Sequence, residues 1–73
     1  MPALRPCRWQ DLEKFVLAEG CEFVRQQGSH RVYWRADLVR PVIVPCYRAV
    51  PVFIIRNTLR QLGVSVAEYL DRP

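Results

Sequence analysis

The sequence has a single histidine, His30, a single lysine, Lys14, and only three glycines in 73 residues. It has no apolar run near the roughly 20 residues that a helix needs to cross a bilayer. No charged segment followed by an apolar one comes after Met1, as a secretory signal would require. We therefore expect a cytoplasmic protein that does not associate with membranes.

Cysteine is also scarce, and its spacing excludes two kinds of site. The three cysteines, Cys7, Cys21 and Cys46, are odd in number and widely separated. This pattern suits neither a disulfide framework nor a zinc site. The one histidine and the seven acids show no ligand spacing either. The sequence therefore predicts reduced thiols, no metal site and no cofactor.

Positive charge is distributed unevenly along the chain. From Arg25 to Arg60 there are seven arginines and one acid, Asp37, whereas four of the seven acids precede Arg25. This split predicts an acidic face and a basic face, and a polyanion is the obvious partner for the basic one. The alternative is a solvated, arginine-rich surface. The near-exclusive use of arginine favours a binding role, because the planar guanidinium binds phosphate bidentately and stacks on bases.

The length and the hydrophobic pattern predict one domain, residues 1–73, with a compact core. Helical spacing followed by a glycine predicts helices over 8–19 and 53–62. Strand-forming runs predict strands over 22–27, 30–35 and 38–44, and the prolines of the third mark it as an edge strand or lie at its ends. A capping box, Ser65-x-x-Glu68, begins a short last helix. The predicted fold is α+β, α-β-β-β-α, with a three-stranded antiparallel sheet that carries two helices on one face.

The only histidine directly follows the Gly28-Ser29 turn that joins the first two strands. Alternation along the second strand predicts that His30, Val32 and Trp34 share one face, and Arg31, Tyr33 and Arg35 the other. Arginines and aromatic rings near a histidine are typical of RNA-binding surfaces. The alternative is a histidine with only a structural or surface role.

An imidazole beside arginines suggests ribonuclease chemistry without a metal. It can take a proton from a ribose 2′-hydroxyl or give one to the leaving oxygen, while arginines stabilise the charge that builds on the phosphate. We expect His30 to be the general acid or base. The expected RNA-binding residues are Arg25, Gln27, Ser29, Arg31 and Arg48. Ser29 is expected mainly to shape the turn, since neighbouring strand residues point to opposite faces.

Several segments together resemble the HicA (YcfA-like) toxin family of toxin–antitoxin systems. They are Gly20, the run 23–30 that ends in Gly-Ser-His, the run 42–45 that ends in proline, and the tail 59–65. The resemblance covers residues 12–65. It implies a fold like that of double-stranded-RNA-binding domains, metal-independent cleavage of mRNA, and inhibition by a HicB-type antitoxin. The family's catalytic histidine falls on His30.

The sequence departs from the family pattern after the third strand. Members often carry a second histidine there and a glycine before the second helix, whereas this chain has Cys46-Tyr47-Arg48 and no glycine. Two alternatives to a toxin therefore stay open: a non-catalytic RNA-binding module on the same fold, and a protein that mainly pairs with an antitoxin. The apolar run 50–55 is either part of an antitoxin-docking patch or a staple between the second helix and the sheet.

Overall fold

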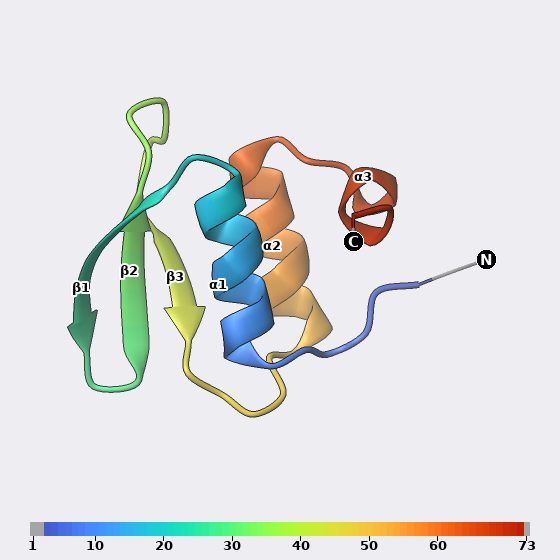
Figure 1. Ribbon diagram of the computed structural model, residues 1–73, viewed down its shortest axis with the longest axis horizontal. Helices are drawn as coiled ribbons and strands as arrows, with labels where there is room; N and C mark the ends of the chain where they lie inside the picture. Colours follow the sequence, from blue (N-terminus) through green and yellow to red (C-terminus); the bar gives the residue numbers. More distant parts are fainter. Residues whose placement is uncertain (1–2, 73) are drawn as a thin grey trace.

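The computed structural model describes residues 3–72, which form three helices and three strands (Figure 1). The elements follow one another as α1 (Trp9–Ala18), β1 (Glu22–Gln27), β2 (His30–Trp34), β3 (Val42–Pro45), α2 (Val52–Leu62) and α3 (Val66–Leu70). The strands are antiparallel, in the order β1-β2-β3. The predicted α-β-β-β-α fold with a short third helix is confirmed.

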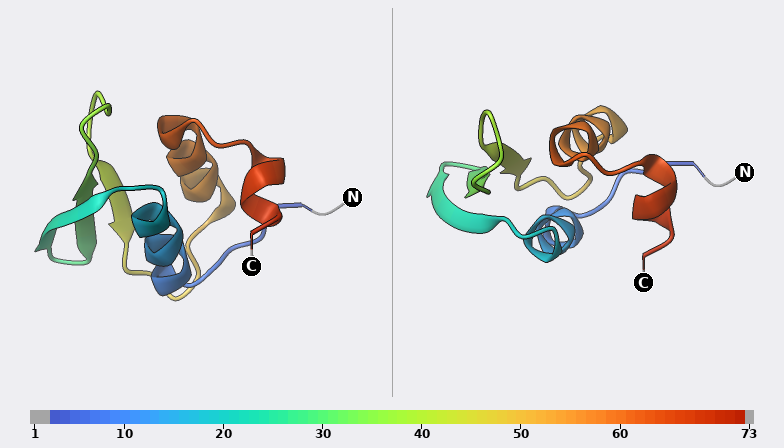
Figure 2. Two further views of the ribbon diagram at one scale, coloured as in Figure 1. Left: turned by 45° about the horizontal axis from the view of Figure 1, so that its top comes forward. Right: turned by 90° about the horizontal axis from the view of Figure 1, so that it is seen from above.

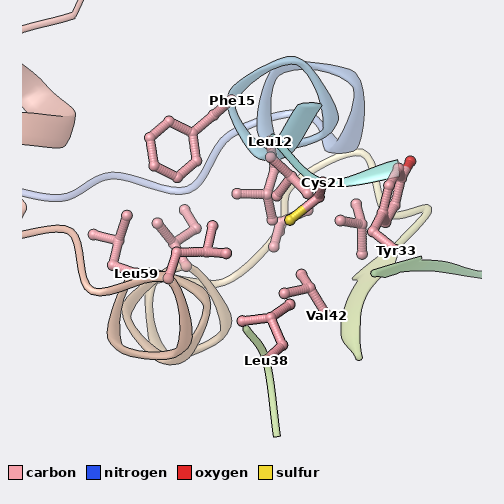
Figure 3. Close-up of a cluster of buried hydrophobic side chains, with 12 residues drawn as sticks. Leu12, Phe15, Cys21, Tyr33, Leu38, Val42 and Leu59 are labelled. Atoms are coloured by element: carbon pink, nitrogen blue, oxygen red, sulfur yellow. The ribbon is translucent and has the colours of Figure 1, made fainter. Parts of the chain in front are cut away.

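Helices α1 and α2 lie on the same side of the sheet, and the other face carries no helix (Figures 1 and 2). The core fills the space between them with side chains from both helices and from β2 and β3 (Figure 3). Its largest fully buried members are Tyr33, Leu12, Ile55 and Leu59. Helix α3 joins the core through Tyr69, whose ring meets that of Phe15 edge-on at 4.9 Å between centroids. None of the helices in residues 3–72 is long and apolar enough to cross a membrane.

The helix ends follow the local signals in the sequence. After α1, Gly20 has a φ of +88°, its N–H bonds to Leu17, and the N–H of Cys21 bonds to Val16. These two bonds form a Schellman motif, which needs a left-handed residue at the position of Gly20. The capping box of α3 is also present, with Ser65 and Glu68 each bonding the other's backbone N–H.

The third strand begins later than predicted. Strand β3 covers only Val42–Pro45, whereas the sequence indicated a start at residue 38. Leu38 instead lies in a turn, where its N–H bonds to the carbonyl of Arg35 at 3.0 Å and its side chain packs into the core. Pro41 has no N–H to continue the ladder. The edge position of β3 is confirmed.

The apolar run 50–55 mainly fastens α2 to the body of the protein. Val50 and Ile55 are fully buried, and Val50 forms a backbone bridge with Cys7. Val52 and Ile54 are half-buried, so only Phe53 exposes most of its side chain, at 63%. The burial of this run favours the staple over a docking patch.

Replacement of Gly20 by alanine is expected to destabilise the protein by about 1 kcal/mol, because an L side chain disfavours a positive φ. A Cβ at this position would meet only Arg35 Cδ, at an ordinary 3.6 Å, so the cost comes from the backbone. Urea unfolding of the wild type and of Gly20→Ala measures it. Gly20→Asn is the matched control and should lose less, since asparagine tolerates this conformation. Equal losses for the two variants would contradict this explanation.

Candidate functional site

His30 is the first residue of the central strand and directly follows a two-residue turn. Gly28 takes the first turn position with a φ of +57°, and Ser29 has a negative φ, the combination that a type II′ turn requires. His30 pairs with Gln27 of β1 on one side and with Pro45 of β3 on the other. The backbone of His30 is therefore held between two neighbouring strands, and its side chain is exposed to solvent.

An irregularity in β1 decides which side chains share the face of His30. The pairing register shifts between Phe23 and Arg25, so that Val24 is an extra residue. Phe23 pairs with the buried Tyr33 on the helix side, with their rings 5.8 Å apart. Past the bulge, Arg25 pairs with Val32 and Gln27 with His30. Directly paired residues point to the same face, so Arg25, Gln27 and His30 all lie on the face without helices.

Arg31 points to the opposite face, as strand alternation predicts. Its guanidinium forms an ion pair with Glu13 of α1, with 3.0 Å between Nη2 and Oε2. It also lies 3.0 Å from the Tyr33 hydroxyl, and its Cζ lies 4.2 Å from the centroid of the Phe23 ring. The Tyr33 hydroxyl donates a hydrogen bond to Glu13. Arg31 thus joins α1 to the sheet, and a direct contact between Arg31 and RNA stays a prediction.

Gln26 connects this network to the turn that carries His30. Arg31 Nη1 donates to Gln26 Oε1 at 2.8 Å, and Gln26 Nε2 donates to the carbonyl of Gly28 at 2.9 Å. Gln26 was not among the predicted site residues. Its position next to Gln27 in the run before the turn is the only local signal for its role, and its partner Arg31 is visible only in the fold.

The remaining predicted residues surround the turn and the loop after β3. The Ser29 carbonyl accepts a hydrogen bond of 2.6 Å from the N–H of Cys46, so Ser29 fastens the turn to this loop. Within residues 3–72 its hydroxyl has no hydrogen bond to His30. In the loop after β3, Tyr47 follows Cys46 and is 43% exposed, and Arg48 is also exposed. This loop carries Cys46, Tyr47 and Arg48 where the resemblance implied a second histidine, and its Cys46 N–H bonds to the turn.

A groove of about 780 Å³ runs from His30 between β3 and α2. His30 and Tyr47 line it beside Pro45, where β3 ends, and Arg40 and Arg60 line it beside Pro41, before β3 begins. Arg40 and Arg60 were not among the predicted RNA contacts. They come from a loop and a helix that meet only in the folded chain, so no spacing in the sequence could have paired them.

Burial raises the pKa of several tyrosine and cysteine side chains in the protein. Desolvation, together with the hydrogen bond to Glu13, raises the pKa of Tyr33 to about 12. Burial also raises the pKa of Tyr69 to about 12 and raises the pKa of the Cys7 and Cys21 thiols, which disfavours reactive thiolates there. All three cysteines are free. Among residues 3–72, no three His, Cys, Asp or Glu side chains come together as a metal-binding group.

Comparison with known proteins gives one family. The model described as "HicA toxin of bacterial toxin-antitoxin" matches residues 9–64, which include both main helices, the whole sheet and His30. Neither the curated proteins nor the solved structures gave a significant match.

Because Tyr33 is buried and bonded to Glu13, the free energy of unfolding depends on pH in the alkaline range. The unfolded chain releases this phenol proton near pH 10, whereas the folded chain keeps it up to about 12. The stabilisation should therefore be complete below pH about 10 and be lost as the pH rises towards 12. Titration of phenolate absorbance should show two of the three tyrosines ionising near pH 12, and only one in Tyr33→Phe. Ionisation of all three near pH 10 in the folded wild type would contradict the network.

Proposed function

Because the chain belongs to the HicA toxin family, and is therefore a toxin of a toxin–antitoxin system, we propose that it is an endoribonuclease that cleaves mRNA with His30. The observation that carries this proposal is the position of His30. It is exposed on the open face of the sheet, at the start of the central strand, beside Arg25 and Gln27. The groove between β3 and α2 begins at the same residue.

The proposed reaction needs only groups that this chain supplies. His30 takes the proton of a ribose 2′-hydroxyl, and the oxygen attacks the neighbouring phosphorus. The bond from phosphorus to the 5′-oxygen breaks, and that oxygen leaves with a proton from the imidazolium or from water. The products are a 2′,3′-cyclic phosphate and a 5′-hydroxyl. Since imidazole and guanidinium groups supply the proton transfers and the charge stabilisation, the proposed reaction is metal-independent.

The neighbours of His30 receive separate roles in this proposal. Arg25 has no ion pair among residues 3–72, so its guanidinium is available for the phosphate whose charge increases in the transition state. Gln27, Ser29 and Arg48 contribute hydrogen bonds and charge to binding of the strand. Arg31, together with Gln26, holds the turn that presents His30.

The proposed partners are mRNA and a HicB-type antitoxin that neutralises the toxin, and the proposed site of action is the cytoplasm. A non-catalytic RNA-binding module is the alternative that one observation favours. The structure places Cys46 and Tyr47, and no second imidazole, where family members often have a histidine. Loss of the imidazole separates the two functions, since RNA binding alone needs the arginines but not His30. A protein that only pairs with an antitoxin should bind RNA weakly at moderate salt.

Controlled expression in a bacterial host should arrest growth and deplete transcripts for the wild type but not for His30→Ala. His30→Gln is the sharper variant, because it keeps a polar side chain of similar size and removes only the proton transfer. Purified His30→Gln should cleave RNA at least about 100-fold more slowly than the wild type. Growth arrest by a soluble, folded His30→Ala would contradict the proposal. RNA binding without cleavage by the wild type would favour the binding module.

A further inference from the structure

The groove between β3 and α2 has a floor, a wall and a fixed far end. Its floor includes Ile43 and Pro45 of β3, which pair with Val32 and His30 and so belong to the open face. Residues of α2 form the wall, from Ile54 to Gln61. The Gln61 side chain donates to the carbonyls of Arg40 and Pro41 at 3.4 and 3.3 Å, and thereby fastens the loop before β3 to α2.

The charged side chains of the groove that have no ion-pair partner are positive. Among the described residues that line it, the one acid is Asp37, and its carboxylate is paired with Arg35 at 2.5 and 3.0 Å. Arg35 holds the pKa of Asp37 below its usual range, so the carboxylate stays ionised and engaged in this pair. Arg40 and Arg60 are exposed, and neither has an ion pair within residues 3–72. Two free guanidinium groups at one end of a groove favour the phosphates of a polyanion.

The other end of the groove carries an aromatic ring and the imidazole. Tyr47 lines the groove together with His30, and its exposed ring offers a face on which a base can stack. Between the two ends, the Asn57 side chain adds an amide that can bond base edges. A duplex keeps its bases stacked and paired inside, whereas a single strand can place a base on Tyr47. The combination of cationic and stacking groups therefore suits single-stranded RNA.

We propose that this groove binds the single-stranded RNA on one side of the bond that His30 cleaves. Tyr47 stacks on a base next to that bond, and Arg40 and Arg60 bind phosphates a few nucleotides further along. The cleavage in this statement rests on the proposed function. The binding does not, because it needs no proton transfer.

The test uses His30→Gln as the parent protein, so that the RNA stays intact. Fluorescence anisotropy measures the Kd of a labelled, mixed-sequence single-stranded oligoribonucleotide at several salt concentrations. Adding Arg40→Ala and Arg60→Ala should weaken binding at least about tenfold and reduce the slope of log Kd against log salt by about 1.4, since each phosphate contact on a single strand contributes about 0.7. The matched control is Arg5→Ala with Lys14→Ala, which removes the same charge from exposed residues outside the groove. Its slope and Kd should stay close to those of the parent.

Tyr47 provides a second measurement that does not depend on charge. Tyr47→Leu should weaken binding about tenfold. Tyr47→Phe should bind as tightly as the parent, because stacking needs the ring and not the hydroxyl. Circular dichroism and thermal melting establish that each variant is folded.

The outcomes separate this inference from the proposed function. Weakened binding by the Arg40 and Arg60 variant supports the groove, even if the wild type proves unable to cleave RNA. Unchanged binding by that variant overturns the groove, even if His30 cleaves. Equal or tighter binding of a duplex of the same sequence overturns the preference for single strands. Unchanged RNA binding together with lost binding of an antitoxin would identify the groove as a protein-docking site and overturn the proposal.

Discussion

The register of the three strands is the constraint on which the rest of this structure depends. Two helices cover only one face of the sheet, so each strand residue points either to the helix side or to the open face, and a slip of one residue would exchange the two sets. Tyr33, Val42 and Val44 hold the register from the inside. The bulge at Val24 adjusts β1 so that Phe23 lies inward and Arg25 outward. This pairing places His30 on the uncovered side at the end of β2, where it is exposed, whereas Val32 on the same face is buried.

The two faces of the sheet have different roles, and both depend on the turn after β1. On the helix side, Glu13, Tyr33 and Arg31 form a network that continues through Gln26 to the backbone of Gly28. On the open side, the same turn carries His30 towards solvent. The half-buried ion pair against α1 thus orders the backbone, whereas Arg25, Arg40 and Arg60 have no ion pair within residues 3–72 and remain available for a polyanion. The fold thus divides these arginines into those that hold the structure together and those that are available for binding.

Local patterns predicted most of the fold. Helical spacing, the glycine at 20, the Ser65-x-x-Glu68 box and the alternation from His30 to Arg35 all act within a few residues, and the structure confirms the elements that they indicated. The predicted start of β3 at residue 38 was wrong, because the burial of Leu38 depends on contacts with distant parts of the chain. For the same reason the sequence could not anticipate the bulge at Val24, which turns Phe23 to the helix side. The residues that line the groove are spread from 30 to 61, so no local sequence pattern indicates it.

The most direct test of the account is the chemistry of the RNA ends that the purified protein produces. If His30 removes the proton from a ribose 2′-hydroxyl, the products must carry 2′,3′-cyclic phosphate and 5′-hydroxyl ends. A strand with 2′-deoxyribose at every position must then resist cleavage. End-group analysis of a cleaved oligoribonucleotide, beside its all-deoxy counterpart, gives the answer. Cyclic phosphate ends and an intact deoxy strand are the predicted result, whereas 5′-phosphate ends or cleavage of the deoxy strand would contradict the proposed role of His30.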